Sequence, residues 1–238
     1  LVSRDGHQVH YYHGGTLRDD GTPMREDALF RIASMTKPVT SIAFMQLVEK
    51  CKVALEDPVS RVLPEFEGLG AYAGGGGDLP FAPTRPGQPM RFVDLLSHMA
   101  GLTYGFQNRT SVDAAYRKAR LDLSRGAITS DEYIATLAKI PLEFEPGTRW
   151  NYSVATDVLG VCVERISGMA LGDYFSENIF APLGMEDTGF DIDPAKQDRL
   201  ADAYLYRPGN APRLTDKGAE SRLMERAKVE RGATISVV

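Results

Sequence analysis

The feature that most constrains this chain is a strongly apolar run, Val39–Val48, with a serine and a lysine just before it. Apolar residues fall on nearly every side of this run, which predicts a helix buried between two layers. Ser34 and Lys37 stand three residues apart at the head of that helix. Side chains at this spacing share one helix face, with Cβ atoms about 5–6 Å apart. The sequence therefore predicts a hydroxyl held beside an amine at the start of a buried helix.

A lysine at the head of a buried helix has a chemical consequence. Burial removes hydration from the ammonium of Lys37 and lowers its pKa from about 10.4 by as much as several units. A neutral lysine can act as a base, so the pair predicts an activated serine nucleophile. The spacing alone leaves an alternative open, in which Ser34 only caps the helix and Lys37 extends to solvent.

The surrounding sequence resembles a known family. Leu29–Pro38 resembles the nucleophile segment of the serine beta-lactamase and penicillin-binding-protein superfamily, in particular its class C-like branch with the family VIII carboxylesterases. The resemblance implies a beta-lactamase/transpeptidase-like fold of the α/β plus all-α class, with an antiparallel sheet, flanking helices and a helical region. Further segments match the family in the expected order: Asp57–Val59, Leu63-Pro64, Asp94–His98, Gly101-Leu102, Glu145–Thr148, Tyr152-Ser153, Pro182–Met185 and Asp187-Thr188.

The family's second motif, Tyr-x-Asn, supplies a tyrosine that shuttles protons together with the lysine. Tyr152 matches this tyrosine, so the resemblance implies the catalytic residues Ser34, Lys37 and Tyr152. A positive charge nearby favours the phenolate, and Tyr152 and Lys37 would titrate as a coupled pair. In the alternative interpretation, Tyr152 is an ordinary aromatic residue before a helix that Ser153 caps and that ends at Gly168.

The chain departs from the family pattern at Val154, where beta-lactamases place the asparagine that binds the substrate amide. An apolar side chain cannot make those hydrogen bonds, and the sequence here resembles the esterase branch. The resemblance implies a serine hydrolase that cleaves short-chain carboxylic esters through an acyl-enzyme on Ser34, without a metal or organic cofactor. The alternatives are a beta-lactamase or D-amino-acid peptidase of the same fold, or a non-catalytic binding relative. Retention of serine, lysine and tyrosine together argues against the last.

The ends of the sequence predict an incomplete fold. Asp5-Gly6 is typical of a hairpin turn, but the family's third motif (Lys-Thr-Gly or its variants) is absent. We expect a fragment truncated at both ends, with the third motif and the second oxyanion donor beyond residue 238. Such a fragment alone would be weak or inactive. Residues 1–238 are expected to form a single domain fragment, with 1–56 and about 195–238 in the α/β part and 57–194 mostly helical.

Three local patterns predict elements within the helical part. Thr129 and Glu132 have the spacing of a capping box for a helix running to Ile140. A second helix is expected over about residues 112–125. Gly74–Gly77, followed by several prolines, predicts a loop.

Composition excludes several classes of function. The formal net charge of −5 argues against a nucleic-acid partner, because phosphate binding needs a basic surface. Apolar runs fall short of the roughly 20 residues of a membrane span. His7, His10 and His13 lie in a predicted strand, where side chains alternate between faces and do not converge on a metal. The expected partner is a small-molecule ester or amide. Oligomeric state and compartment stay open, with the cytoplasm slightly favoured.

Overall fold

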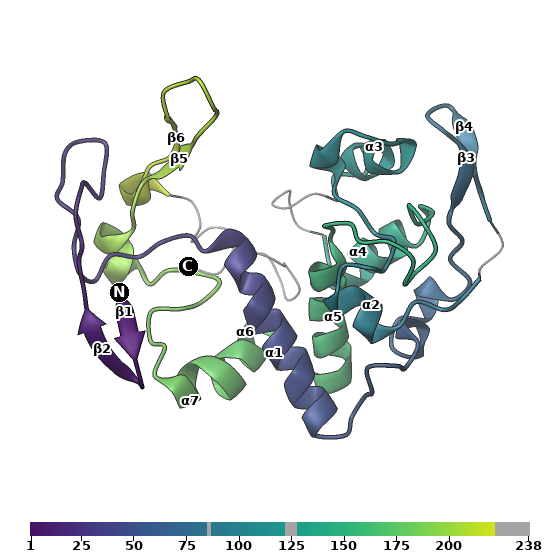
Figure 1. Cartoon of the computed structure of the whole chain (residues 1–238), viewed down its shortest axis with the longest axis horizontal. Coiled ribbons are helices and arrows are strands. Elements are labelled where there is room, and N and C mark those ends of the chain that lie inside the picture. Colours follow the sequence, from purple (N-terminus) through teal and green to yellow (C-terminus); the bar gives the residue numbers. More distant parts are fainter. Residues whose placement is uncertain (85–86, 122–127, 222–238) are drawn as a thin grey trace. The chain divides into compact units, whose positions relative to one another are not determined.

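The computed structural model describes residues 1–84, 87–121 and 128–221. Within these residues the chain forms two compact units (Figure 1). Unit 1 consists of residues 1–33 and 187–221, and unit 2 of residues 34–186. The assignment of the whole chain to a single domain, with parts that meet near residues 56 and 195, stays a prediction.

Unit 1 contains two antiparallel hairpins. β1 (Val2–Arg4) pairs with β2 (His7–His10), and β5 (Ala203–Leu205) pairs with β6 (Arg213–Asp216). The turn between β1 and β2 is Asp5-Gly6, with φ angles of 51° and 77°. A two-residue turn of this kind requires positive φ at both positions, so the predicted hairpin is confirmed.

The two chain segments of unit 1 meet around a small apolar cluster. Leu29 forms a parallel bridge with Leu200, and both are buried together with Ile192. The Arg31 guanidinium donates a hydrogen bond to the Ala201 carbonyl. Backbone pairing and this cluster therefore hold the N-terminal segment against residues 187–221.

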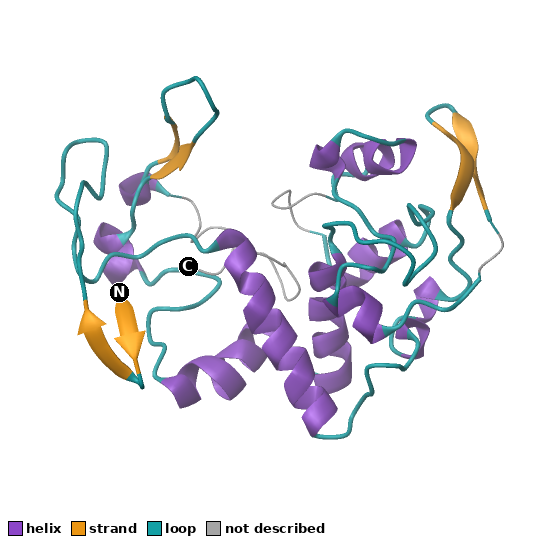
Figure 2. Ribbon diagram, in the orientation of Figure 1, coloured by secondary structure: helices purple, strands orange, loops and turns teal. Residues whose placement is uncertain are grey.

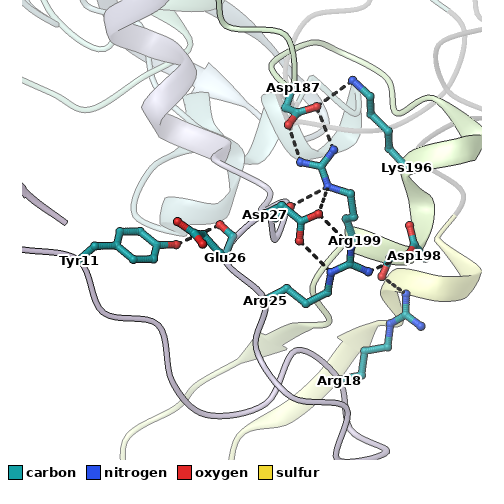
Figure 3. Close-up of polar contacts among 9 residues, drawn as sticks. All are labelled: Tyr11, Arg18, Arg25, Glu26, Asp27, Asp187, Lys196, Asp198 and Arg199. Carbon is teal, nitrogen blue, oxygen red and sulfur yellow. Dashed lines mark hydrogen bonds and ion pairs between the residues drawn. The ribbon is translucent and has the colours of Figure 1, made fainter. Parts of the chain in front are cut away.

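An ion-pair network covers part of the same unit (Figure 3). The carboxylate of Asp187 accepts hydrogen bonds from Lys196 and Arg199. Arg199 also pairs with Asp27, and Arg25 bridges Asp27 and a further aspartate, Asp198. The hydrogen bonds from Arg199 and Lys196 lower the pKa of Asp187 to about 2. These ion pairs join residues 25–27 to residues 187–199.

Unit 2 is mainly helical, as the purple ribbons of Figure 2 show. One glycine-rich hairpin pairs β3 with β4 in antiparallel fashion. A π-helical turn, Ser176–Phe180, follows α6 directly. The elements are α1 (Thr36–Glu49), β3 (Tyr72–Gly76), β4 (Leu79–Pro83), α2 (Phe92–Leu96), α3 (Ser111–Lys118), α4 (Ser130–Leu137), α5 (Ala155–Ser167), α6 (Leu171–Phe175) and α7 (Ala181–Leu183).

The core of unit 2 lies where α1 packs against α5 and α6. Phe44 of α1 is fully buried, with its ring 4.9 Å from that of Phe92 on α2. Burying one such side chain stabilises the fold by about 1.5–3 kcal/mol. The prediction of a helix buried on nearly every side is wrong, because Ile42 and Met45 are 51% and 41% exposed. The buried residues of α1 follow the 3–4-residue spacing of one helical stripe: Thr36, Thr40, Ala43, Phe44 and Leu47.

Two local predictions in unit 2 also need correction. The loop expected at Gly74–Gly77 belongs mostly to β3. The two strands of this hairpin approach so closely that a side chain on Gly75 would clash with the Pro80 carbonyl. Glycine therefore permits the pairing here. The helix expected over 112–125 ends at Lys118, and Arg120 has a left-handed φ of 56°. Residues 122–125 lie outside the described part of the chain.

The predicted start of α4 is confirmed, but the helix expected to run to Ile140 ends at Leu137. The Thr129 side chain accepts from the Glu132 backbone N–H, and the Glu132 carboxylate accepts from the Thr129 N–H, which confirms the capping box of α4. α5 ends at Gly168, as predicted. Both signals act within a few residues, where local chemistry decides the structure.

Candidate active site

Ser34 lies in a short 3₁₀ helix, Ala33–Met35, that leads directly into α1. Ser34 is exposed to solvent. The preceding residue, Ala33, has a φ of 43°, a left-handed conformation that is unfavourable for a residue with a Cβ and is enriched at functional sites. The N-cap of α1 is Met35 and no side chain caps the helix. The alternative in which Ser34 serves only as a helix cap is therefore wrong.

The hydroxyl of Ser34 meets the hydroxyl of Tyr152. Their oxygens are 2.7 Å apart, although the residues are separated by 118 positions in the sequence. The packing of α1 against α5 brings them together, since Ser34 precedes α1 and Tyr152 precedes α5. Either oxygen can donate the hydrogen bond, so the contact suits proton transfer in both directions.

Lys37 lies in the first turn of α1 and places its ammonium against two tyrosine rings. Nζ is 5.0 Å from the ring centroid of Tyr152 and 5.6 Å from that of Tyr104. A cation within about 6 Å of a ring centroid is attracted by the π face. The structure therefore brings the three residues predicted from the sequence, Ser34, Lys37 and Tyr152, into one cluster.

The segment around Tyr152 is anchored to the loop that follows α2. Gln107 donates from Nε2 to the carbonyl of Tyr152. The Asn151 side chain donates to the Leu102 carbonyl, 2.9 Å away, and accepts from Arg109. These hydrogen bonds fix the backbone at Tyr152 and thereby position its side chain.

Val154 occupies the position where the family motif has asparagine. Its side chain is 1% exposed, and its backbone N–H donates to the Thr103 carbonyl at 3.2 Å. Ser153, also buried, accepts a hydrogen bond from the Ala155 N–H at the start of α5. Val154 therefore offers a substrate no polar group from its side chain.

His98 is a polar neighbour that the sequence did not single out. Its ring centroid is 5.0 Å from that of Tyr152, and its Nδ1 is 3.3 Å from the hydroxyl oxygen of Ser153. Burial lowers the pKa of His98, and the charge of Lys37 lowers it further. A neutral imidazole beside Tyr152 follows from this environment.

Asp157 is a second polar residue that the sequence analysis missed. It lies on α5 with 3% exposure, and its Oδ2 accepts a hydrogen bond of 3.2 Å from the Tyr104 hydroxyl. Burial raises the pKa of Asp157 to about 7, against the opposing effects of Lys37 and the Tyr104 hydrogen bond. No signal in the sequence indicated its burial, because at about 3.6 residues per turn Asp157 lies on the side of the predicted helix opposite Ala155 and Leu159.

Metal ligands and membrane-spanning helices both bear on the kind of site this is. In residues 1–84, 87–121 and 128–221, no group of three or more His, Cys, Asp or Glu side chains is placed to hold a metal ion. No helix within the same ranges is both long and apolar enough to cross a membrane. The described cluster offers hydroxyl, phenol, amine and imidazole groups for acid–base and nucleophilic chemistry.

Comparison with known proteins places this geometry in context. The beta-lactamase family model matches residues 1–224. An uncharacterized protein of Mycobacterium tuberculosis is 43% identical over 187 residues, which are 78% of this chain and 45% of that protein. Esterase EstB of Burkholderia gladioli is 37% identical over 231 residues, which are 94% of this chain and 54% of the esterase.

A solved structure is similar as well. EstCE1, described as a hydrolase with promiscuous acyltransferase activity, matches with a TM-score of 0.75 and 28% sequence identity. The match covers 94% of this chain and 59% of EstCE1. The chain spans about half the length of the curated relatives it matches.

Proposed function

Because this chain belongs to the beta-lactamase family, we propose that it carries the nucleophile of a serine hydrolase that cleaves carboxylic esters. The predicted beta-lactamase/transpeptidase-like fold, with antiparallel strand pairs and a helical region, is confirmed by the similarity to EstCE1. The observation that carries the proposal is the 2.7 Å contact between the hydroxyls of Ser34 and Tyr152, with Lys37 against the Tyr152 ring.

Acylation starts with transfer of the Ser34 proton to Tyr152 as the serine oxygen attacks the ester carbonyl. The positive charge of Lys37 favours the phenolate of Tyr152, which then accepts that proton. The tetrahedral intermediate collapses, the bond to the alcohol oxygen breaks, and the alcohol leaves with the proton from Tyr152. The Ser34 backbone N–H is one donor for the oxyanion, as in the family that the sequence resembles.

Deacylation repeats the same steps with water. Water gives a proton to Tyr152 and attacks the acyl carbonyl, and Ser34 leaves with that proton while the carboxylic acid is released. Ser34, Tyr152 and Lys37 return to their starting states. Electron pairs and protons balance without a metal or an organic cofactor.

Ester cleavage is favoured over beta-lactam cleavage by two observations. The Val154 side chain is apolar and buried, so it cannot hydrogen-bond a substrate amide. The relative that matches over 94% of this chain is named an esterase. A beta-lactamase, a D-amino-acid peptidase and a non-catalytic binding protein are the outcomes against which the experiment discriminates.

The experiment compares hydrolysis of 4-nitrophenyl butyrate and nitrocefin by the protein at its full natural length. We expect ester hydrolysis to exceed nitrocefin hydrolysis and to fall by about 10⁴-fold or more in Ser34→Ala. Ser41→Ala, a serine substitution within α1, is the matched control and should retain activity. Nitrocefin turnover that rivals ester turnover would favour a beta-lactamase. Ester turnover that survives Ser34→Ala would overturn the proposal.

A further inference from the structure

Asp157 is a buried carboxyl for which the proposed chemistry provides no role. A buried carboxylate is unfavourable unless it is paired or hydrogen-bonded. The other buried aspartates of unit 2 follow this rule, since Asp94 pairs with Arg91 and Asp113 with Arg117. Asp157 differs from them because its carboxylate accepts a hydrogen bond from a tyrosine hydroxyl rather than from a guanidinium.

Tyr104 connects Asp157 to the candidate site. Its side chain is 1% exposed, its hydroxyl donates to Asp157, and its ring lies 5.6 Å below the Lys37 ammonium. Phe106 stacks on the same ring at 4.9 Å between centroids. The ring is therefore fixed at its hydroxyl by Asp157 and on its surface by Phe106. Because the Lys37 ammonium lies against this ring, the hydrogen bond from Tyr104 to Asp157 helps to fix the position of the Lys37 side chain.

The charged neighbours of Asp157 support a link to Lys37. Lys37 on α1 is the cation whose charge acts on the Asp157 carboxyl. Asp94 on α2 is occupied by its arginine partner, and Asp173 on α6 is exposed. On its other side, Lys37 lies against Tyr152 and acts on His98. A change of charge at Asp157 is therefore transmitted to Lys37.

We propose that Asp157 is a positioning residue that acts through Tyr104 to orient the Lys37 ammonium against Tyr152. The inference rests on the proposed function of the same site. A protonated Asp157 keeps Tyr104 in place without adding a negative charge. An ionised Asp157 adds a buried negative charge beside the cluster, and this charge opposes formation of the Tyr152 phenolate. Because burial raises the pKa of Asp157 to about 7, this change takes place near neutral pH.

The test is the pH dependence of Ser34 labelling by a fluorophosphonate, followed by intact mass between pH 5 and 10. In Asp157→Asn, a neutral amide of the same shape replaces the carboxyl. We expect the midpoint of the rising limb to move about 0.5–1 unit to lower pH, because the buried negative charge that opposes formation of the Tyr152 phenolate is lost. In Tyr104→Phe, the carboxylate loses its hydrogen bond and stays protonated to higher pH, so we expect a smaller shift in the same direction.

Asp113→Asn is the matched control, since it removes a buried aspartate of unit 2 that is paired with Arg117. Its midpoint should equal that of the unaltered protein. A lower maximal rate in Asp157→Asn with an unmoved midpoint would indicate a merely structural role and overturn the inference alone. Tyr104→Phe keeps the inference testable if Asp157→Asn does not fold. Absence of Ser34 labelling in the unaltered protein would overturn the proposed function and the inference with it.

Discussion

Two aspartates show how differently the two units use charge. Asp187 of unit 1 lies at the surface, where Arg199 and Lys196 hold its pKa at about 2. Asp157 of unit 2 is buried, and the loss of hydration raises its pKa to about 7. A surface carboxylate can pair with cations while it stays hydrated. A buried carboxylate loses its hydration and is stabilised only by the hydrogen bonds and charges of its protein neighbours. The environment therefore decides which protonation state each aspartate favours.

The contrast extends to what stabilises each unit. The ion pairs of Figure 3 lie beside a small apolar cluster in unit 1, formed by Leu29, Ile192 and Leu200. Unit 2 buries large side chains such as Phe44 and Phe92 and places the Ser34 cluster beside that core. Unit 2 has surface ion pairs as well, such as that of Arg165 with Glu65, so the difference lies in its larger apolar core and in the buried Asp157.

The largest expected effect on stability is in the core of unit 2. Phe44→Ala should lower the free energy of unfolding by about 3–5 kcal/mol, because it removes a fully buried ring and leaves a cavity. Ile42→Ala, an exposed position on the same helix, is the control and should change stability by about 0.5 kcal/mol or less. Urea unfolding measures both. Equal losses would mean that α1 does not pack as described.

A second prediction uses the raised pKa of Asp157. A carboxyl whose folded-state pKa is about 7 stabilises the fold fully below its unfolded pKa of about 3.9 and loses that contribution as pH rises toward 7. Asp157→Asn should remove this decline. The urea midpoints of the two proteins at pH 5 and pH 8 provide the measurement. If both proteins lost the same stability between these pH values, Asp157 would not be the titrating group.

The smallest expected effect concerns Asp187, where the sign is reversed. Its lowered pKa means that it stabilises unit 1 above about pH 4 and loses that contribution as pH falls toward 2. Exposed ion pairs contribute about 0–1 kcal/mol and are screened by salt. We expect Asp187→Asn to speed hydrogen exchange at the Leu29 and Ala201 amides modestly in low salt, and less in high salt. The exposed Asp191→Asn is the control. A loss that high salt does not reduce would contradict a surface electrostatic role.

The sequence predicted the parts of the structure that depend on nearby residues. The Asp5-Gly6 turn and the Thr129 capping box are each decided within a few positions. The sequence also predicted that Ser34 and Lys37 lie together at the start of α1, because residues three apart are separated by about one helical turn. Tyr152 could be assigned only through the family motif, because nothing local indicates its contact with Ser34.

The remainder of the site depends on contacts between distant parts of the chain. Tyr104 and Asp157 are 53 positions apart, and Gln107 and Tyr152 are 45 apart. No sequence spacing predicts either pair, because both contacts form only when the loop after α2 packs against α5 and the segment before it. The hairpin at Gly74–Gly77 was missed for a related reason. Glycine is typical of loops, and only the pairing of β3 with β4 gives these residues an extended structure.

Fluorophosphonate labelling, followed by intact mass and peptide mapping, tests most directly whether Ser34, Lys37 and Tyr152 form an activated nucleophile. The expected result is a single adduct on Ser34, formed at least about 100-fold more slowly in Lys37→Ala. Lys50→Ala, just beyond α1, should label at the unaltered rate. An adduct on another residue, or equal labelling of Ser34 with and without Lys37, would contradict an activated serine–lysine–tyrosine site.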